Sequence, residues 1–277
     1  MTRSLDVLLN RIFQVRSPFL GVFRLLKKKK HNKSWKNISV VIIPVIKKDI
    51  NALKISINSL IKIQNYIGEI HLIIRSNEIE FFQDFRNEQV KLICEENILN
   101  SEEQKLRGWL KQQLIKIKHA SDLVQYSFVM WMDSDLTWIN RESIFDDRNN
   151  PILRYSDENH ILYKNGLIQL GFKPSWTRSF IPHYMVVEPV LCKDLLLVIS
   201  KNEDYAREIT KIAESNYDMF SEYDLYAAIY LRSRQNVTMM YWNVKNSRSD
   251  LLLEHEKNSR KYAKFGYTAI AYHNYDG

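Results

Sequence analysis

Apolar stretches alternate with segments of helical spacing through the first half of the chain. Four stretches are predicted to form strands: residues 37–46, 69–77, 90–96 and 127–133. The first, NISVVIIPVI, is β-branched and carries a continuous apolar run, as is typical of a strand buried on both faces of a sheet. The segments between them with helical character are residues 49–66, 78–86 and 101–124. The alternation predicts an α/β fold with a mostly parallel sheet that is flanked by helices on both faces.

The helix predicted over residues 101–124 starts with the polar signals of a helix N-terminus. Ser101 is the expected N-cap, and Glu102 and Glu103 lie in the expected first turn. A second helix with an N-cap is predicted over residues 221–234, where Ser221 takes that position. Both helices would follow irregular segments, so their caps fix where they begin.

The second half of the chain has a less regular pattern. Residues 250–266 are predicted to form a helix, and residues 192–215 a helical region in two parts. Strands are predicted over residues 237–244 and 267–274. Shorter strand-like pieces fall within residues 158–166 and 179–193. No internal repeat and no linker follows residue 37, so residues 37–277 are interpreted as one domain.

Composition is that of a soluble globular protein, with 45% hydrophobic and 26% charged residues over 277 positions. The 7 glycines are too few to favour a glycine-rich phosphate loop. Cys94 and Cys192, the two cysteines, lie far apart and form neither a disulfide framework nor a zinc spacing. This usage favours a reducing, cytoplasmic compartment.

Positive charge is concentrated in the first 36 residues. They hold ten Lys and Arg and one Asp, a net charge of +9, which leaves the remaining 241 residues at −1. A nucleic-acid-binding protein is expected to spread basic residues over a folded face. The confinement of the charge to one end therefore argues against a nucleic-acid partner.

Residues 1–36 form an amphipathic, basic extension. Apolar positions recur at helical spacing, Pro18 interrupts them, and three arginines keep the run below the ~20 apolar residues that span a bilayer. The basic cluster follows the apolar part, which is the wrong order for a signal peptide. Two interpretations stay open: a helix packed on the domain with a solvated lysine linker, or an anchor on an anionic membrane surface.

Asp133 and Asp135 stand directly after the most apolar predicted strand. Two carboxylates so close together resist ionising at the same time unless a cation lies between them. Hard oxygen ligands with open positions suit Mg²⁺ or Mn²⁺. The alternative is that both residues cap a turn. Because ligands of open α/β sheets bind beyond the carboxyl ends of the strands, the position favours a metal site.

Two further motifs accompany this Asp-Ser-Asp. Residues 108–117 read GWLKQQLIKI, and residues 221–226 read SEYDLY. With these motifs the chain, over roughly residues 38–245, resembles nucleotide-sugar glycosyltransferases of the GT-A fold. It is similar in particular to a bacterial family of GT-A character found among surface-polysaccharide genes. The resemblance implies a Rossmann-like fold in which the Asp-x-Asp motif holds a divalent metal on the donor diphosphate.

The resemblance also implies roles for individual residues. The expected metal ligands are Asp133, Asp135 and His273. The expected donor-binding residues are Pro44, Val45, Arg75, Asn77, Gln112, Lys116 and Asp133. If the reaction inverts the anomeric centre, the expected acid–base residues are Glu222, the first choice, and Asp224. The residue types of the irregular segment 174–189 suit a sugar acceptor site, with Trp176, Arg178, His183 and Tyr184 as the expected acceptor-binding residues, or equally a loop packed over the core. Each has a plainer alternative: a first-turn carboxylate stabilises the helix dipole, and a helical lysine can simply be solvated.

The sequence therefore predicts a glycosyltransferase that depends on Mn²⁺ or Mg²⁺. Its expected partners are a nucleotide-sugar donor and a glycan or lipid-linked acceptor. Its expected place is the inner face of a bacterial plasma membrane, in polysaccharide, capsule or lipopolysaccharide assembly. A sugar nucleotidyltransferase is the enzymatic alternative, although the segment IIPVIKKD lacks the glycines of its phosphate loop. A non-catalytic, membrane-associated partner is the third possibility.

Overall fold

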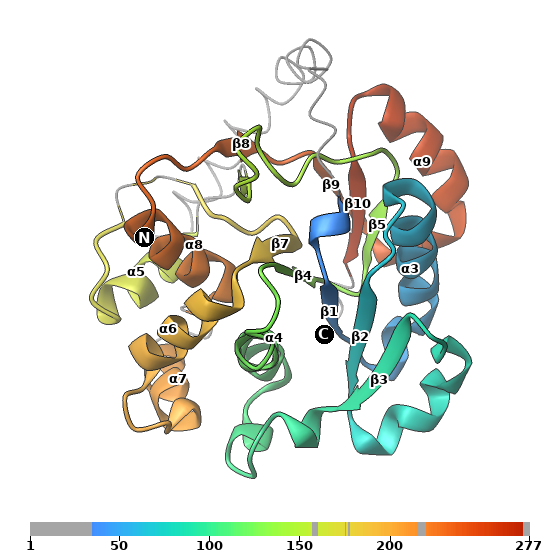
Figure 1. Cartoon of the computed structure of the whole chain (residues 1–277). Helices are drawn as coiled ribbons and strands as arrows, with labels where there is room; N and C mark the ends of the chain where they lie inside the picture. The colour runs from blue at the N-terminus through green and yellow to red at the C-terminus, as the bar shows by residue number, and fades with distance from the viewer. Residues whose placement is uncertain (1–34, 157–159, 175, 177, 215–219, 274–277) are drawn as a thin grey trace, which may run out of the picture.

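The computed structural model of the chain describes residues 35–156, 160–174, 176, 178–214 and 220–273. Almost the whole predicted extension, residues 1–34, lies outside this part. The centre of the described part is a five-stranded sheet in the order β3-β2-β1-β4-β7 (Figure 1). Its strands are β1 Val40–Pro44, β2 Glu69–Ile74, β3 Val90–Cys94, β4 Val129–Met132 and β7 Tyr184–Val187. β7 is antiparallel to β4 and the other pairs are parallel, so the mostly parallel sheet is confirmed.

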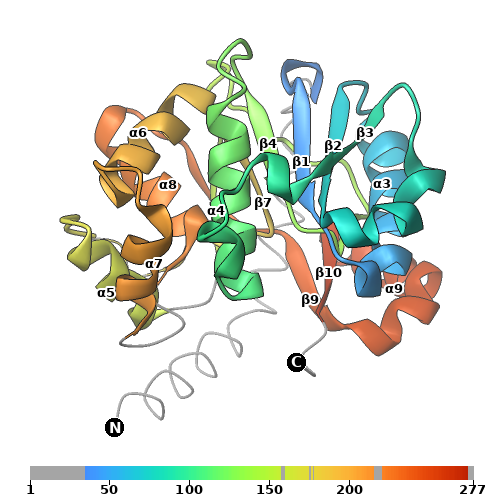
Figure 2. The ribbon, with the colours of Figure 1, turned by 90° about the horizontal axis from the view of Figure 1, so that it is seen from below.

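Successive residues of the strands face two separate cores, as the two-residue period of a strand requires. Val40 and Ile42 of β1 pack in one core with α4 (Gly108–Ser121), α6 (Pro189–Ile199) and α8 (Glu222–Ser233). Val41 and Ile43 pack in the other core with α3 (Ile50–Gln64). Figure 2 shows the helices on opposite sides of the sheet. Because both faces are covered, continuous apolar strands are stable here.

Smaller elements complete the described part of the fold. A three-stranded sheet has the order β5-β10-β9, with β5 Leu136–Trp138, β9 Val244–Arg248 and β10 Ala269–His273. β6 Leu153–Tyr155 pairs with β8 Met239–Tyr241. The remaining helices are α5 Ile161–Gln169, α7 Tyr205–Glu214 and α9 His255–Lys264. No helix among the described residues is long and apolar enough to cross a membrane.

The helix predicted over residues 101–124 is shorter than expected, and its predicted N-cap is wrong. α4 begins at Gly108, and residues 103–105 form a separate 3-10 turn. Leu106 and Arg107 have extended backbone angles, with ψ of 148° and 146°, and these interrupt the helix before Gly108. The side-chain oxygen of Asn100 accepts hydrogen bonds from the backbone N–H groups of Glu102 and Glu103, each at 3.0 Å, and caps the short turn that precedes the break. The helix predicted over 78–86 is likewise a 3-10 helix, Ser76–Phe85.

In the second half, the strand-like piece at 158–166 is wrong, because residues 161–169 form α5. The strand predicted over 237–244 is divided into β8 and the start of β9, and the helix predicted over 250–266 begins only at His255. The helix at 221–234 is confirmed as α8. Its N-cap Ser221 accepts a hydrogen bond from the backbone N–H of Asp224 at 3.3 Å.

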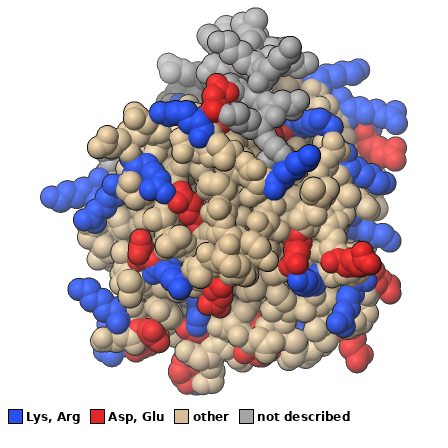
Figure 3. Space-filling view, viewed as in Figure 1, with Lys and Arg blue, Asp and Glu red and all other residues tan. Residues whose placement is uncertain are grey.

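Charged side chains of both signs are interspersed over most of the face seen in Figure 3. The residues of the candidate site lie at the carboxyl ends of the parallel strands. There β1 ends at Pro44, β2 at Ile74 and β4 at Met132. The residues that follow, Val45, Arg75 and Asp133, therefore come to one edge of the sheet, as the sequence predicted.

Candidate active site

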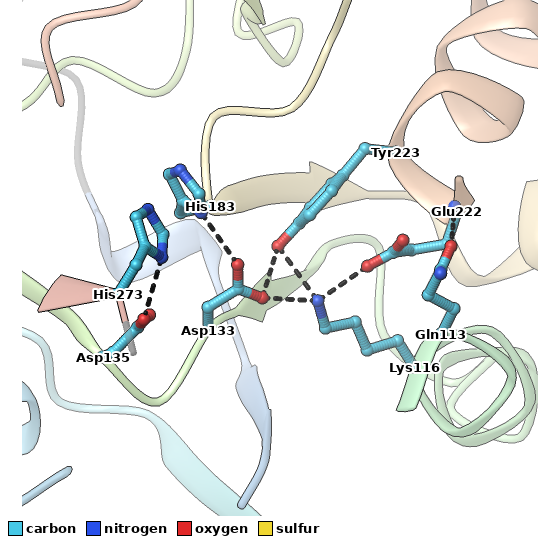
Figure 4. Close-up of polar contacts among 8 residues, drawn as sticks. All are labelled: Gln113, Lys116, Asp133, Asp135, His183, Glu222, Tyr223 and His273. Carbon is cyan, nitrogen blue, oxygen red and sulfur yellow. Dashed lines mark hydrogen bonds and ion pairs between the residues drawn. The ribbon is translucent and has the colours of Figure 1, made fainter. Parts of the chain in front are cut away.

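Asp133 and Asp135 lie in a tight turn between β4 and β5 that is held from several sides. The backbone N–H of Asp133 donates to the carbonyl of His183 at 2.9 Å, and the N–H of Leu136 donates to the carbonyl of Asp133 at 3.2 Å. The carbonyl of Asp135 accepts from the N–H of Tyr272 in β10 at 3.1 Å. The turn is thereby fixed between the two sheets, and its two carboxylates face different partners (Figure 4).

The Asp133 carboxylate belongs to a cluster built around Lys116 of α4, which we call the Lys116 cluster: Lys116, Asp133, Glu222 and Tyr223. The Lys116 Nζ donates to Asp133 Oδ1 at 2.6 Å, to Glu222 Oε1 at 2.7 Å and to the Tyr223 hydroxyl at 3.1 Å. The Tyr223 hydroxyl in turn donates to Asp133 Oδ1 at 3.0 Å. Lys116 is 2% exposed. A lysine this deep is stable only with such partners.

His183 occupies the second oxygen of the same carboxylate. Its Nδ1 donates to Asp133 Oδ2 at 3.0 Å. The ring centroid lies 4.6 Å from that of His273 and 5.7 Å from that of Trp242. His183 also has a φ of 63°, in the left-handed region that residues other than glycine rarely adopt. Such strain is characteristic of functional sites.

The pKa values of the cluster follow from burial and from the charges within it. Burial alone raises the pKa of the Asp133 carboxyl, but the charge of Lys116 and the His183 hydrogen bond outweigh it and hold this pKa well below its usual value. Burial lowers the pKa of Lys116, and the charges of Asp133 and Glu222 reverse this and raise it. For Glu222 burial prevails and its pKa is raised. Asp133 is thus the carboxyl of the cluster that stays ionised to the lowest pH.

Asp135 has a different partner, His273 at the end of β10. Its Oδ2 lies 3.2 Å from His273 Nδ1, and the two side chains are 22% and 18% exposed. A carboxylate oxygen and an imidazole nitrogen at one exposed edge are suitable ligands for a divalent cation. Asp133 offers less, because both its oxygens already accept hydrogen bonds. Among the described residues, no group of three or more His, Cys, Asp or Glu could hold a metal ion. The site therefore offers two protein ligands, Asp135 and His273, and leaves the other coordination positions open. Mg²⁺ and Mn²⁺ bind at such sites when phosphates and water complete the coordination shell.

The predicted donor-binding residues lie on the same edge, with one exception. Val45 follows β1, and Arg75 follows β2, where its Nε is 3.7 Å from the buried Glu95. Asn77 is exposed and Gln112 is half-buried on α4. Pro44 is buried as the last residue of β1. Lys116, by contrast, lies beneath the surface, and its contacts are those of an internal ion pair.

The predicted acceptor residues have different partners. Tyr184 is in the core, with its ring 4.8 Å from that of Trp138. Trp176 packs against Phe180 at 5.7 Å, and the Arg178 guanidinium lies 5.5 Å from the ring of Tyr155. His183 binds Asp133. The acceptor role of this segment stays a prediction.

Both predicted acid–base residues are buried at the start of α8. Glu222 is 3% exposed and paired with Lys116, and Asp224 is 2% exposed. Asp224 Oδ1 accepts a hydrogen bond from the backbone N–H of Phe180 at 2.7 Å, which connects α8 to the segment before β7. Burial raises the pKa of Asp224 to about 6. Both carboxylates therefore have structural partners in the free protein.

Two site residues were not predicted, Gln113 and Tyr223. Gln113 Oε1 accepts the backbone N–H of Glu222 at 2.9 Å, and Tyr223 reaches Asp133 as described. Both lie within the sequence motifs GWLKQQ and SEYDLY. Their signal was the helical spacing: Gln113 and Lys116 are three residues apart on α4 and so share a face. The sequence did not indicate which element this face of α4 would contact.

Comparisons with other proteins locate the chain within one family. The model described as "Family of unknown function (DUF6492)" matches residues 35–273. No curated protein matches the sequence. Among solved structures, the apo form of mouse xyloside xylosyltransferase 1 is similar at a TM-score of 0.43 and 10% identity, over 83% of this chain and 96% of that one.

The apo structure of the bifunctional glycosyltransferase WbbM is similar at a TM-score of 0.46 and 11% identity, over 87% of this chain. The match spans 46% of the WbbM chain, so the protein corresponds to about half of that length. With TM-scores below 0.5, neither likeness carries an argument about function.

Proposed function

We propose that this chain, which belongs to the DUF6492 family, is a glycosyltransferase that moves a sugar from a nucleotide-sugar donor to an acceptor with the help of a divalent cation. The observation that carries the proposal is the pair Asp135 and His273. Asp135 lies in the turn before β5 and His273 ends β10, at distant points of the chain, and their side chains lie 3.2 Å apart at the carboxyl edge of the fold. Ligands of open, mostly parallel sheets bind at this edge.

Asp135 and His273 are the two residues that would hold the cation. When bound, Mn²⁺ or Mg²⁺ neutralises the negative charge that develops on the leaving nucleoside diphosphate. The protein's part is to fix the two ligands. Asp135 is held by the turn and by the backbone of Tyr272, and His273 by its place in β10. A preorganised pair needs no rearrangement when the donor arrives, and preorganisation is the main source of electrostatic catalysis.

Around this pair, we propose that Val45, Arg75, Asn77 and Gln112 form the donor site. They lie on the same edge, and an exposed amide and a guanidinium can bind ribose hydroxyls and phosphate. Asp133, with its carboxylate 20% exposed, borders the site from the side of α4. The acid–base roles of Glu222 and Asp224, and the acceptor roles of Trp176 and Arg178, stay predictions.

The other expectations extend the proposal from the sequence. We infer that the acceptor is a glycan or a lipid-linked glycan in bacterial surface-polysaccharide assembly, and that the basic extension 1–36 meets the anionic inner face of the plasma membrane. Vesicle co-sedimentation of the chain with and without residues 1–34 tests the second point. Unchanged binding after truncation would contradict it.

A nucleotidyltransferase uses the same edge of a similar sheet but has a glycine-rich basic loop after its first strand. Residues 45–49, which follow β1, contain no glycine. This supports transfer of the sugar over formation of the nucleotide sugar. A non-catalytic role predicts that Asp135→Asn leaves cellular function intact.

A thermal-shift panel of nucleotide sugars, with and without Mn²⁺, tests the proposal directly. A donor present at 100 times its dissociation constant stabilises the protein by about 2.7 kcal/mol, which for a chain of this size raises Tm by about 5 °C. We expect one nucleotide sugar to give this shift only with Mn²⁺, and Asp135→Asn to abolish it. Asp250→Asn is the matched control, because Asp250 is an exposed carboxylate paired with Arg248 at 3.0 Å. The proposal fails if no nucleotide sugar gives a metal-dependent shift, or if Asp135→Asn behaves like the control.

A further inference from the structure

We propose that Lys116 is a positioning residue that locks the Asp133 carboxylate at the edge of the donor site, and that Glu222 is the counter-ion of Lys116 rather than a general base. The inference rests on the proposed function for its kinetic consequences. Its structural basis is the Lys116 cluster. Lys116 has three polar partners there: Asp133, which follows β4, and Glu222 and Tyr223, which begin α8.

The first step is that Lys116 cannot serve the donor directly. Its side chain is 2% exposed, and its Nζ already has three partners between 2.6 and 3.1 Å. An ammonium group has three protons to donate, and these three contacts use them all. Lys116, which the sequence predicted to bind a donor phosphate, therefore has no proton left to donate to one.

The second step is that these contacts fix the orientation of Asp133. Its Oδ1 accepts from Lys116 and from the Tyr223 hydroxyl, and its Oδ2 accepts from His183. Rotation of the carboxylate would break at least one charge-assisted hydrogen bond, which is among the stronger contacts of a protein. Asp133 therefore presents one fixed edge to the site, 20% exposed.

The third step concerns Glu222, whose carboxylate is 4% exposed and lies 2.7 Å from Lys116. A general base must come within hydrogen-bond reach of the proton that it removes. Burial and the ion pair withhold Glu222 from any acceptor hydroxyl. The Gln113 side chain also binds the backbone N–H of Glu222, so the position of this residue is fixed by α4 at two points.

The motifs GWLKQQ and SEYDLY thus form the two sides of one contact. Gln113 and Lys116 lie on the face of α4 that meets the first turn of α8, and Glu222 and Tyr223 provide the other side. Asp133, at the end of β4, is the point where this contact reaches the surface. The arrangement explains why three motifs far apart in the sequence contribute to one edge.

The test compares Lys116→Met with Lys118→Met, a control on the same helix. Lys118 also makes an ion pair of 2.7 Å, but with the buried Glu103, outside the cluster. With the donor and Mn²⁺ identified by the panel, we expect Lys116→Met to lower kcat at least tenfold. The Kd for Mn²⁺ and the matching nucleoside diphosphate should change less than threefold, because Asp135 and His273 are untouched. Lys118→Met should keep kcat within threefold although it loses an ion pair of similar length.

Milder variants keep the inference open to refutation if Lys116→Met does not fold. Tyr223→Phe removes one donor to Asp133 and should lower kcat severalfold with little effect on KM. Lys116→Arg keeps the charge and should recover part of the kcat lost in Lys116→Met. Glu222→Gln should keep kcat within tenfold and leave the pH profile of kcat unchanged. Loss of the acidic limb of that profile, where a general base becomes protonated, or equal kcat in Lys116→Met and Lys118→Met, overturns the inference while the proposed function stands. A wild type that neither binds nor transfers overturns both.

Discussion

The strongest energetic prediction concerns the Lys116 cluster. Replacing Lys116 by Met keeps most of the aliphatic volume and removes the positive charge between Asp133 and Glu222. The side chains of Lys116 and Glu222 are 2% and 4% exposed, so solvent cannot take over the role of the lysine. We expect Lys116→Met to lower the free energy of unfolding substantially, and the loss to depend on whether Glu222 is present.

The size of the loss follows from the burial of the partners. Breaking a buried ion pair from one side costs about 3–5 kcal/mol, because a charge is left without a partner. The pKa of Glu222 is already raised by burial, so this carboxyl can take up a proton in the variant, and Asp133 keeps His183. Both effects favour the lower end, about 3 kcal/mol. Glu222→Gln leaves the Lys116–Asp133 contact intact and should cost about 1.5 kcal/mol.

The double variant Lys116→Met/Glu222→Gln separates this contact from general damage. If the two side chains interact as the geometry indicates, the double variant should lose about 1.5 kcal/mol less than the sum of the single variants. Urea unfolding at pH 7, followed by circular dichroism, gives the four free energies. Lys118→Met, which removes the ion pair with Glu103, combined with Glu222→Gln is the control and should be additive. Additivity within about 0.5 kcal/mol for the Lys116 pair as well would refute the reasoning.

Two further predictions have opposite pH dependence. Burial lowers the pKa of His119 to about 4 from 6.5, so the unfolded state binds more protons between these values. Stability from this group is present above pH 6.5 and is lost as the pH falls toward 4, by up to about 3 kcal/mol. In urea titrations, the free energy of unfolding of His119→Gln should therefore rise relative to that of the wild type as the pH falls from 6.5 to 4. Burial raises the pKa of Asp224 from 3.8 to about 6, so here the folded state binds more protons. Its contribution is present below pH 3.8 and is lost as the pH rises through 6. Asp224→Asn keeps an acceptor for the Phe180 N–H. Its free energy of unfolding should rise relative to that of the wild type as the pH rises from 4.5 to 7.5. A difference from wild type that does not change with pH would contradict either prediction.

The central sheet was predictable because each of its parallel strands carries its own signal. β1, β2 and β4 are buried on both faces over almost every residue; β1 and β4 are unbroken apolar runs, and in β2 only Glu69 and His71 are polar. The position of Asp133 after β4 followed from the end of such a run. β7 lies within a segment predicted to contain strand-like pieces, but its pairing with β4 did not follow from the pattern, because antiparallel partners need not be adjacent in sequence.

Backbone conformation defeated the prediction ahead of α4. Leu106 and Arg107 are extended, so α4 begins only at Gly108, and Asn100 caps a short separate turn before them. β5 was missed because its three residues, Leu136 to Trp138, are too few to show a period. Their strand conformation comes from pairing with β10, far along the chain.

The site was predicted in its residues more than in its contacts. Lys116 and Glu222 were both singled out, yet each had a sufficient local explanation, one as a solvated helical lysine and one as a first-turn carboxylate. Their contact joins positions 106 residues apart, and no local pattern encodes it. The separation of Asp133 from Asp135, each with its own partner, is likewise a property of the turn in three dimensions.

The position of β10 in its sheet also determines when the site can exist during synthesis. β10 is the middle strand, antiparallel to β5 and parallel to β9, and it carries His273. A ribosome releases Asp135 long before it releases His273, and chains fold from the N-terminal side as they emerge. Until β10 inserts between its two neighbours, the acidic turn has no imidazole beside it. The cation and donor binding proposed for this edge would thus require β10 in place, and a bound donor would in turn slow the detachment of this strand.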